Sequence, residues 1–289
     1  MFMLKLLYAF AFLLIVGGLL YQYAPLETFN LFVPKDDGGE LIARDIAYGP
    51  AARNKLDIFV PATGNGPWPV VVFVHGGSWK SGSKHPYEFL GRALAARGFM
   101  VAAISYRLHP QDPYPSFVED AALALDWATR HAGECGGDQD RIFALGHSAG
   151  AYNVAQSILD KHYLARLGTN VTAIKGVATL AGPFDFLPLD TAVSIDVFGK
   201  VPDLPNTQPV NHARADAPPF LILHGSADTT CRPRNSIALD KALRAAGAKS
   251  ELKIYDGVSH VGIMLAFAKP LRGLAPTLKD VITFFRSQL

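Results

Sequence analysis

The chain has 289 residues, of which 49% are hydrophobic and 18% are charged, and its formal net charge is +2. This length allows one large domain with a sizeable core. A nearly balanced charge without Lys/Arg runs gives no support for a nucleic-acid-binding surface, so we expect no nucleic acid among the partners.

The N-terminus departs from the composition of the rest of the chain. Residues 6–20 are uncharged and almost wholly apolar, and Lys5 precedes them. With the first residues included, this run approaches the ~20 residues that span a bilayer. A cleaved secretory signal is the competing interpretation, although small residues at a cleavage position are poorly placed, and a core helix would show a polar face. We expect 1–24 to be a membrane anchor or signal segment and 25–39 a linker, with the catalytic-sized domain membrane-anchored or exported outside the cytoplasm, in the periplasm if the source is bacterial.

Beyond the linker, strand and helix patterns alternate along residues 40–289. Short runs of β-branched and aromatic residues, such as 70–74, are typical of strands buried on both faces of a sheet. We expect strands at 40–48, 55–60, 70–74, 99–104, 141–145, 174–180, 220–223 and 251–255, and helices at 89–97, 120–131, 149–159, 235–246 and 278–286. This order predicts an α/β domain with a mostly parallel central sheet flanked by helices.

The alternation is interrupted between residues 182 and 218. This segment follows the sixth expected strand, is rich in Pro, Asp and aromatic residues, and has no clear period. An insertion of such length in a compact domain is usually functional, so we expect a lid-like insertion at 182–218.

The pentapeptide GHSAG at 146–150 matches the G-x-S-x-G pattern of a nucleophile elbow. It lies between an expected strand and an Ala-rich expected helix, where such an elbow must lie. The glycines are needed because side chains at 146 and 150 would collide with the neighbouring strand and helix. A tight turn without catalytic meaning is the alternative, but the context favours Ser148 as a nucleophile.

Chain order then selects the partners of Ser148, because on this fold the acid follows the serine and the histidine comes last. His260 is the only histidine beyond residue 224, and it lies in a loop after the last expected strand. Asp228 follows the preceding strand and is the expected acid. Asp185 is the second candidate, whereas Asp256 is too close to His260 in sequence to approach its ring from behind.

The glycine-rich segment 75–84 has two interpretations. The spacing of Gly77 and Gly82 resembles a phosphate-binding loop, but that motif requires a lysine directly after the second glycine, and Lys84 comes one residue late. The other interpretation is an oxyanion hole, with one N–H from this loop and another from the residue after the nucleophile. The register favours the second interpretation.

Five segments in this order resemble the α/β-hydrolase carboxylesterases: HGGSW at 75–79, SYRL at 105–108, GHSAG at 146–150, HGSAD at 224–228 and GVSH at 257–260. The resemblance covers about residues 40–287 and is strongest to the hormone-sensitive-lipase-like and feruloyl-esterase-like branch, which is also similar to kynurenine formamidase. It departs at Ser78, where lipase-like members carry a third glycine and formamidases often carry a bulky aromatic residue.

The resemblance implies a cofactor-free and metal-free serine esterase with the α/β-hydrolase fold, acting on a small-molecule ester through Ser148, Asp228 and His260. The oxyanion hole is expected from Gly77, Ser78 and Ala149. Short-chain or aryl esters are the expected substrates; an aryl-formamidase-like amide hydrolase and a non-catalytic binding scaffold are the alternatives. Four aromatic residues are candidates to line the substrate pocket, although they are equally suited to the core: Trp79, Phe184, Phe186 and Phe198.

Several further residues are expected to be structural. His75 is expected to orient its loop, and Arg107 with Asp120 to tie the loop after the fourth strand. The two cysteines, Cys135 and Cys231, are expected to be free thiols, because the fold places them near opposite ends of the sheet.

Overall fold

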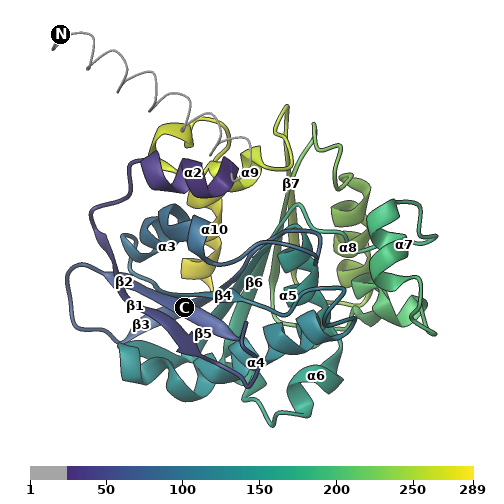
Figure 1. Ribbon diagram of the computed structural model, residues 1–289, viewed down its shortest axis with the longest axis horizontal. Helices are drawn as coiled ribbons and strands as arrows, with labels where there is room; N and C mark the ends of the chain where they lie inside the picture. The colour runs from purple at the N-terminus through teal and green to yellow at the C-terminus, as the bar shows by residue number, and fades with distance from the viewer. Residues whose placement is uncertain (1–24) are drawn as a thin grey trace, which may run out of the picture.

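The computed structural model describes residues 25–289, and the expected anchor at 1–24 lies outside them. Eight strands form one sheet in the order β1-β2-β4-β3-β5-β6-β7-β8 (Figure 1). β2 pairs antiparallel with both of its neighbours, and all the pairs from β4 to β8 are parallel. The strands are β1 (Gly39–Ala47), β2 (Lys55–Pro61), β3 (Trp68–Val74), β4 (Met100–Ser105), β5 (Gly137–His147), β6 (Ile174–Leu180), β7 (Phe220–Gly225) and β8 (Ser250–Tyr255).

Helices cover both faces of this sheet, as expected for an α/β domain. Alternation of side chains along β3 sends Val70 and Val72 into the core under α4, α5 and α8, and Val71 and Phe73 into the core under α3 and α10. The helices are α2 (Pro25–Phe32), α3 (Glu88–Ala95), α4 (Ser116–His131), α5 (Ala149–Leu159), α6 (Lys161–Ala165), α7 (Ala192–Phe198), α8 (Arg234–Ala245), α9 (Gly262–Leu265) and α10 (Thr277–Ser287).

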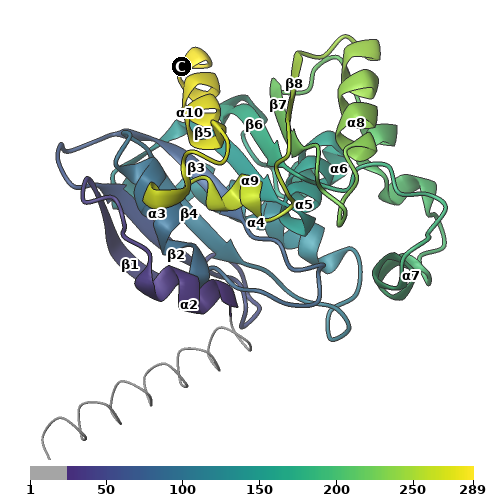
Figure 2. The same ribbon diagram turned by 90° about the horizontal axis from the view of Figure 1, so that it is seen from above.

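The expected lid segment holds a short helix that the sequence did not predict. Between β6 and β7 the chain forms α7, which lies at the opposite end of the molecule from β1 (Figure 2). Thr191 caps α7 in a reciprocal box with Ser194, and Val197 and Phe198 are buried. A helix of seven residues depends on such packing for its stability, which explains why its sequence carries a weak signal.

The segment 25–39, predicted as a linker, contains the helix α2. Leu26 and Phe29 of this helix pack against the core on the α3 side, and the Phe29 ring meets the Phe89 ring edge-on at 5.4 Å. The linker prediction therefore needs correction for this helix. Within residues 25–289, no helix is both long and apolar enough to cross a bilayer.

Candidate active site

Ser148 occupies a strained turn between β5 and α5. Its backbone has φ 55° and ψ −123°, a conformation that costs a non-glycine residue about 1–3 kcal/mol. A Cβ at Gly150 would lie 2.1 Å from the carbonyl oxygen of Val74 in β3, and one at Gly146 would lie 2.4 Å from the carbonyl oxygen of Gly150. Both glycines are therefore required by close backbone packing, as the motif predicted.

The structure brings the three residues selected by chain order into one hydrogen-bonded row. His260 Nε2 lies 2.9 Å from Ser148 Oγ, and His260 Nδ1 lies 2.7 Å from Asp228 Oδ2. Because the carboxylate only accepts, Nδ1 carries the proton, and the lone pair of Nε2 then faces the serine hydroxyl. This arrangement has the geometry that general-base removal of the Ser148 proton requires.

Asp228 is held as an anion by donors on both of its oxygens. Oδ1 accepts from the backbone N–H groups of Thr230 and Cys231 at 2.9 and 2.8 Å. Oδ2 faces His260 and also lies 3.1 Å from His224 Nε2. Burial alone would raise the pKa of Asp228, but hydrogen bonds from His224, His260 and the Cys231 N–H outweigh it and hold that pKa well below its usual range.

His224 was present in the predicted HGSAD segment, but its role was not foreseen. Its Nε2 lies between two acceptors, Asp228 Oδ2 and the Cys231 carbonyl oxygen at 2.6 Å, so that nitrogen carries the proton. Its Nδ1 lies 2.7 Å from Ser236 Oγ and accepts from that hydroxyl. His224 thus fixes both Asp228 and the loop that carries it.

His147 holds the loop that carries His260. It lies next to Ser148, and its Nε2 donates to the backbone carbonyl oxygen of His260 at 3.0 Å. Burial, followed by the nearby His260, lowers the pKa of His147 to about 3, so its ring is neutral. The sequence offered only the x position of G-x-S-x-G as a signal for this role.

The loop after β3 carries three consecutive residues with positive φ: Gly77 at 126°, Ser78 at 53° and Trp79 at 59°. Two of these are not glycine, and each costs about 1–3 kcal/mol in this region. Within residues 25–289, the backbone N–H groups of Gly77 and Ser78 have no acceptor. The N–H of Ala149 is in the first turn of α5, where no intrahelical acceptor exists.

A cavity of about 260 Å³ opens beside Ser148. Its wall includes Ser78 and Ala149, so two of the predicted oxyanion residues border the same space as the serine. Trp79 and Phe186, two of the four aromatic candidates, also line it. Phe184 and Phe198 are fully buried and do not border it: Phe198 packs edge-on against the Trp79 ring at 4.9 Å, behind the wall. These two residues have the burial expected of core residues.

The residues expected to be structural have structural contacts. The Asp120 carboxylate accepts from the backbone N–H of Arg107 at 2.7 Å and from its Nε at 2.9 Å, which ties the loop after β4 to α4. His75 is buried, donates from Nδ1 to the Gly76 carbonyl oxygen at 2.6 Å and stacks on Tyr106 at 4.4 Å. Burial lowers the pKa of His75 to about 3.

The alternative candidates lie elsewhere. Asp185 is exposed, and its N–H donates to Asn235 Oδ1. The Asp256 carboxylate accepts from Ser226 Oγ at 3.0 Å. Cys135 and Cys231 are both free, and Cys231 borders the cavity. In the described part of the chain, no group of three or more His, Cys, Asp or Glu residues is arranged to hold a metal ion.

The sequence profile of the BD-FAE family matches residues 56–243, which is more than half of the chain. The chain belongs to the BD-FAE family. The match includes Ser148 and Asp228 and ends before His260, so the histidine of the row comes from outside the matched region.

Curated relatives of this BD-FAE chain are named as esterases. A probable isoprenylcysteine alpha-carbonyl methylesterase of Arabidopsis thaliana, ICMEL1, is 30% identical over 95% of this chain and 60% of its own length. The probable carboxylic ester hydrolase LipM of Mycobacterium tuberculosis is 33% identical over 74% of this chain and 53% of its own length. The chain thus spans about half to three fifths of the length of these relatives.

Solved structures share the fold. Esterase B of Lactobacillus rhamnosis superposes with a TM-score of 0.79 at 19% identity, covering 96% of this chain and 95% of its own. A hormone-sensitive lipase from a metagenome library superposes with a TM-score of 0.74 at 23% identity, covering 93% and 92%. These similarities establish the α/β-hydrolase fold.

Proposed function

We propose that this protein is a serine esterase that cleaves carboxylic esters through an acyl-enzyme on Ser148. The observation that carries the proposal is the row from Asp228 to His260 to Ser148, at 2.7 and 2.9 Å, with Ser148 bordering a cavity. A binding scaffold has no need for a strained serine aligned with an imidazole and an ionised carboxylate.

In the proposed mechanism, Ser148 Oγ attacks the acyl carbonyl while His260 Nε2 takes its proton. The imidazolium then protonates the leaving alcohol, and Asp228 stabilises that cation and keeps the ring in the required tautomer. Water repeats the cycle and releases the acid. The unpaired N–H groups of Gly77, Ser78 and Ala149 would bind the oxyanion, each contributing about 3–4 kcal/mol to lowering the barrier.

The proposed substrates are short-chain or aryl esters. The cavity of about 260 Å³ lies below the ~300–1,000 Å³ range of drug-sized ligand pockets, and the rings of Trp79 and Phe186 line it. The plant relatives are named methylesterases, so methyl esters with a small leaving alcohol belong among the substrates to be tested.

A fluorophosphonate probe tests the nucleophile. Native protein is expected to be labelled, Ser148→Ala is expected not to be, and Ser226→Ala, an exposed serine that hydrogen-bonds Asp256, serves as the matched control and is expected to label normally. Equal labelling of native protein and Ser148→Ala, or none of native protein, would contradict the esterase proposal.

A series of p-nitrophenyl esters of increasing acyl length tests the substrate class, with methyl, feruloyl and N-formylkynurenine substrates alongside. The highest kcat/KM is expected for short acyl chains, because longer chains exceed the cavity. Faster turnover of the formamide than of every ester would assign the protein to the formamidase-like alternative.

For localisation, we propose that the apolar residues 6–20 export or anchor the domain, a proposal supported by their composition and by Lys5 in front of them. A periplasmic reporter fused after Leu289 is expected to be active in a bacterial host. Activity of a cytoplasmic reporter alone would refute this orientation.

A further inference from the structure

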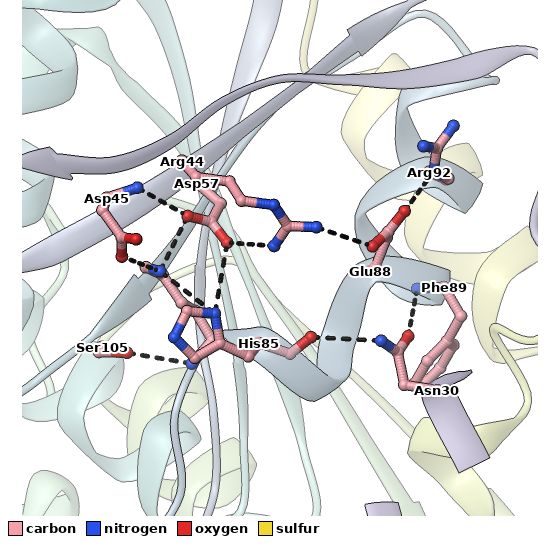
Figure 3. Close-up of polar contacts among 10 residues, drawn as sticks. Asn30, Arg44, Asp45, Asp57, His85, Glu88, Phe89, Arg92 and Ser105 are labelled. Carbon is pink, nitrogen blue, oxygen red and sulfur yellow. Dashed lines mark hydrogen bonds and ion pairs between the residues drawn. The ribbon is translucent and has the colours of Figure 1, made fainter. Parts of the chain in front are cut away.

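Lys84 is a buried lysine at the end of the loop that follows β3. Its side chain is 1% exposed, and its Nζ lies 2.6 Å from Asp45 Oδ1 and 2.8 Å from Asp57 Oδ1. Asp57 is 2% exposed, whereas the Asp45 carboxylate reaches solvent. Figure 3 shows Asp45 and Asp57 close together, with the Arg44 guanidinium between Asp57 and Glu88. An ammonium enclosed by two carboxylates is unavailable to a phosphate. This agrees with the sequence, in which Lys84 comes one residue too late for a phosphate-binding loop.

These contacts join the loop to three strands. Asp45 belongs to β1 and Asp57 to β2, and the backbone N–H of Lys84 donates to Ser105 Oγ, at the end of β4, at 3.0 Å. Taking a lysine and an aspartate out of water is costly, and a buried ion pair is often no more stabilising than an apolar pair of the same volume. The contacts of Lys84 therefore matter more for the position in which they hold the loop than for the free energy of folding that they add.

The contacts of Lys84 hold the end of a compact turn, residues 76–84, whose last residues pack against its first residues. The Gly77 carbonyl oxygen accepts from the N–H groups of Lys80 and Ser81, both at 3.0 Å. Gly82 then passes so close to the first limb that a Cβ there would lie 2.7 Å from the Gly76 carbonyl oxygen and 2.8 Å from the ring of His75. The second limb, which ends at Lys84, thus packs directly against the first limb, which leads into Gly77 and Ser78.

Strain makes such an anchor necessary. The three consecutive positive φ values at Gly77, Ser78 and Trp79 persist only where surrounding contacts impose them, because this region is unfavourable for the two non-glycine residues. β3 holds the start of the turn, and Lys84 holds its end. Released at that end, the turn can relax, and the N–H groups of Gly77 and Ser78 then shift relative to the cavity, whose wall includes Ser78.

We propose that Lys84 is a positioning residue for the oxyanion hole: its ion pairs with Asp57 and Asp45 clamp the loop so that the Gly77 and Ser78 N–H groups point to the developing oxyanion. This inference rests on the proposed esterase function. Lys84 touches no substrate, and its influence passes through the backbone of residues 76–82.

The test compares Lys84→Met with native enzyme at a temperature far below both Tm values. Displacement of a donor by about 1 Å costs roughly 10- to 100-fold in rate, so kcat is expected to fall by that factor while KM changes by less than about threefold. Affinity for a trifluoromethyl ketone, which forms a tetrahedral adduct with an oxyanion, is expected to fall in proportion to kcat/KM. Asp45→Asn, which removes the exposed partner, is expected to lower kcat less.

A double variant separates positioning from folding. Lys84→Met leaves the buried Asp57 with only the more distant Arg44, at 3.5 Å, so its Tm is expected to fall. Adding Asp57→Asn removes that charge but keeps an acceptor for the Asp45 N–H, which bonds it at 2.9 Å. In the double variant Tm is expected to recover while kcat stays low. Recovery of kcat together with Tm would show a purely structural role and overturn the inference.

Leu243→Ala provides the matched control, because Leu243 is fully buried in α8, away from the loop. It is expected to lower Tm and leave kcat and ketone affinity unchanged. If the native enzyme hydrolyses esters and the Lys84→Met variant is fully active as well, this inference is contradicted while the proposed function stands. Native protein that neither hydrolyses esters nor reacts with fluorophosphonate would contradict the proposed function itself.

Discussion

The cavity beside Ser148 is bordered by two strained turns that are held in different ways. In the elbow at 146–150 only Ser148 has a positive φ outside glycine, and regular structure continues on both sides as β5 and α5. In the loop at 75–84 three consecutive residues have positive φ, two of them not glycine, and the chain that follows is a short 3-10 turn rather than a long helix. The elbow is imposed by its immediate neighbours, whereas the loop depends on side chains from β1, β2, β4 and α5.

The largest expected effect tests the close packing of the elbow. Gly150→Ala places a Cβ 2.1 Å from the Val74 carbonyl oxygen and 2.4 Å from that of His75, both backbone atoms, so we expect a loss of unfolding free energy of more than ~4 kcal/mol. Gly98→Ala is the matched control, because Gly98 also has a positive φ but nothing within 4 Å of the added Cβ; it is expected to cost about 1 kcal/mol. Urea titration measures both, and equal losses would refute the packing argument.

Each turn also contains one buried neutral histidine, His147 in the elbow and His75 in the loop, with a pKa lowered to about 3. Below pH ~6.5 these two histidines become protonated in the unfolded chain but stay neutral in the folded protein. The free energy of unfolding is therefore expected to fall as pH drops from ~6.5 toward ~3, by up to about 1.4 kcal/mol per pH unit for each histidine. Denaturation across this window measures the slope. His75→Gln and His147→Gln are each expected to reduce it, and an unchanged slope in both would contradict neutral burial.

A smaller effect is expected on the acid side of the site. His224→Leu removes a donor that lies 3.1 Å from Asp228 Oδ2, so we expect a loss of about 2 kcal/mol of unfolding free energy and roughly a tenfold fall in kcat/KM. Ser236→Ala, which removes only the far partner of His224, is the control and is expected to change both quantities less. A larger effect from Ser236→Ala than from the His224 variant would show that the contact of His224 with Ser236, and not the contact with Asp228, is the important one.

The smallest expected effect on the rate concerns the link between the two turns. Trp79 Nε1 in the loop donates to Asn153 Oδ1 in α5 at 3.0 Å, and both side chains are buried. Asn153→Leu leaves the indole N–H unpaired and is expected to lower unfolding free energy by about 1–3 kcal/mol and kcat by a few-fold. Trp79→Phe combined with Asn153→Leu removes both partners and is expected to lose less than the sum of the single variants. Additivity of the two losses would argue against this link.

Much of the architecture followed from local pattern. The strand at 174–180 and the helix at 149–159 were predicted with the bounds that the structure has. β5 begins earlier than predicted, at Gly137, because Gly137 and Asp138 pair with Trp68 and Pro69 of β3, a partner that local sequence does not reveal. The short helices α2, α6 and α7 were missed because burial against other elements, rather than intrinsic preference, favours them.

For the site, the sequence by itself determined the glycine spacing around Ser148 and the chain order of Ser148, Asp228 and His260. Both are constraints of local sterics and of strand succession, and they can be read one segment at a time. Only the tertiary structure decided that His224 and His147 hold the acid and base loops, that Phe198 lies behind the cavity wall while Phe186 borders it, and that Lys84 faces Asp45 and Asp57. His224 and Asp228 are four positions apart, but the other contacts join residues tens to more than a hundred positions apart. The strength of all of them depends on burial that the order of residues does not specify.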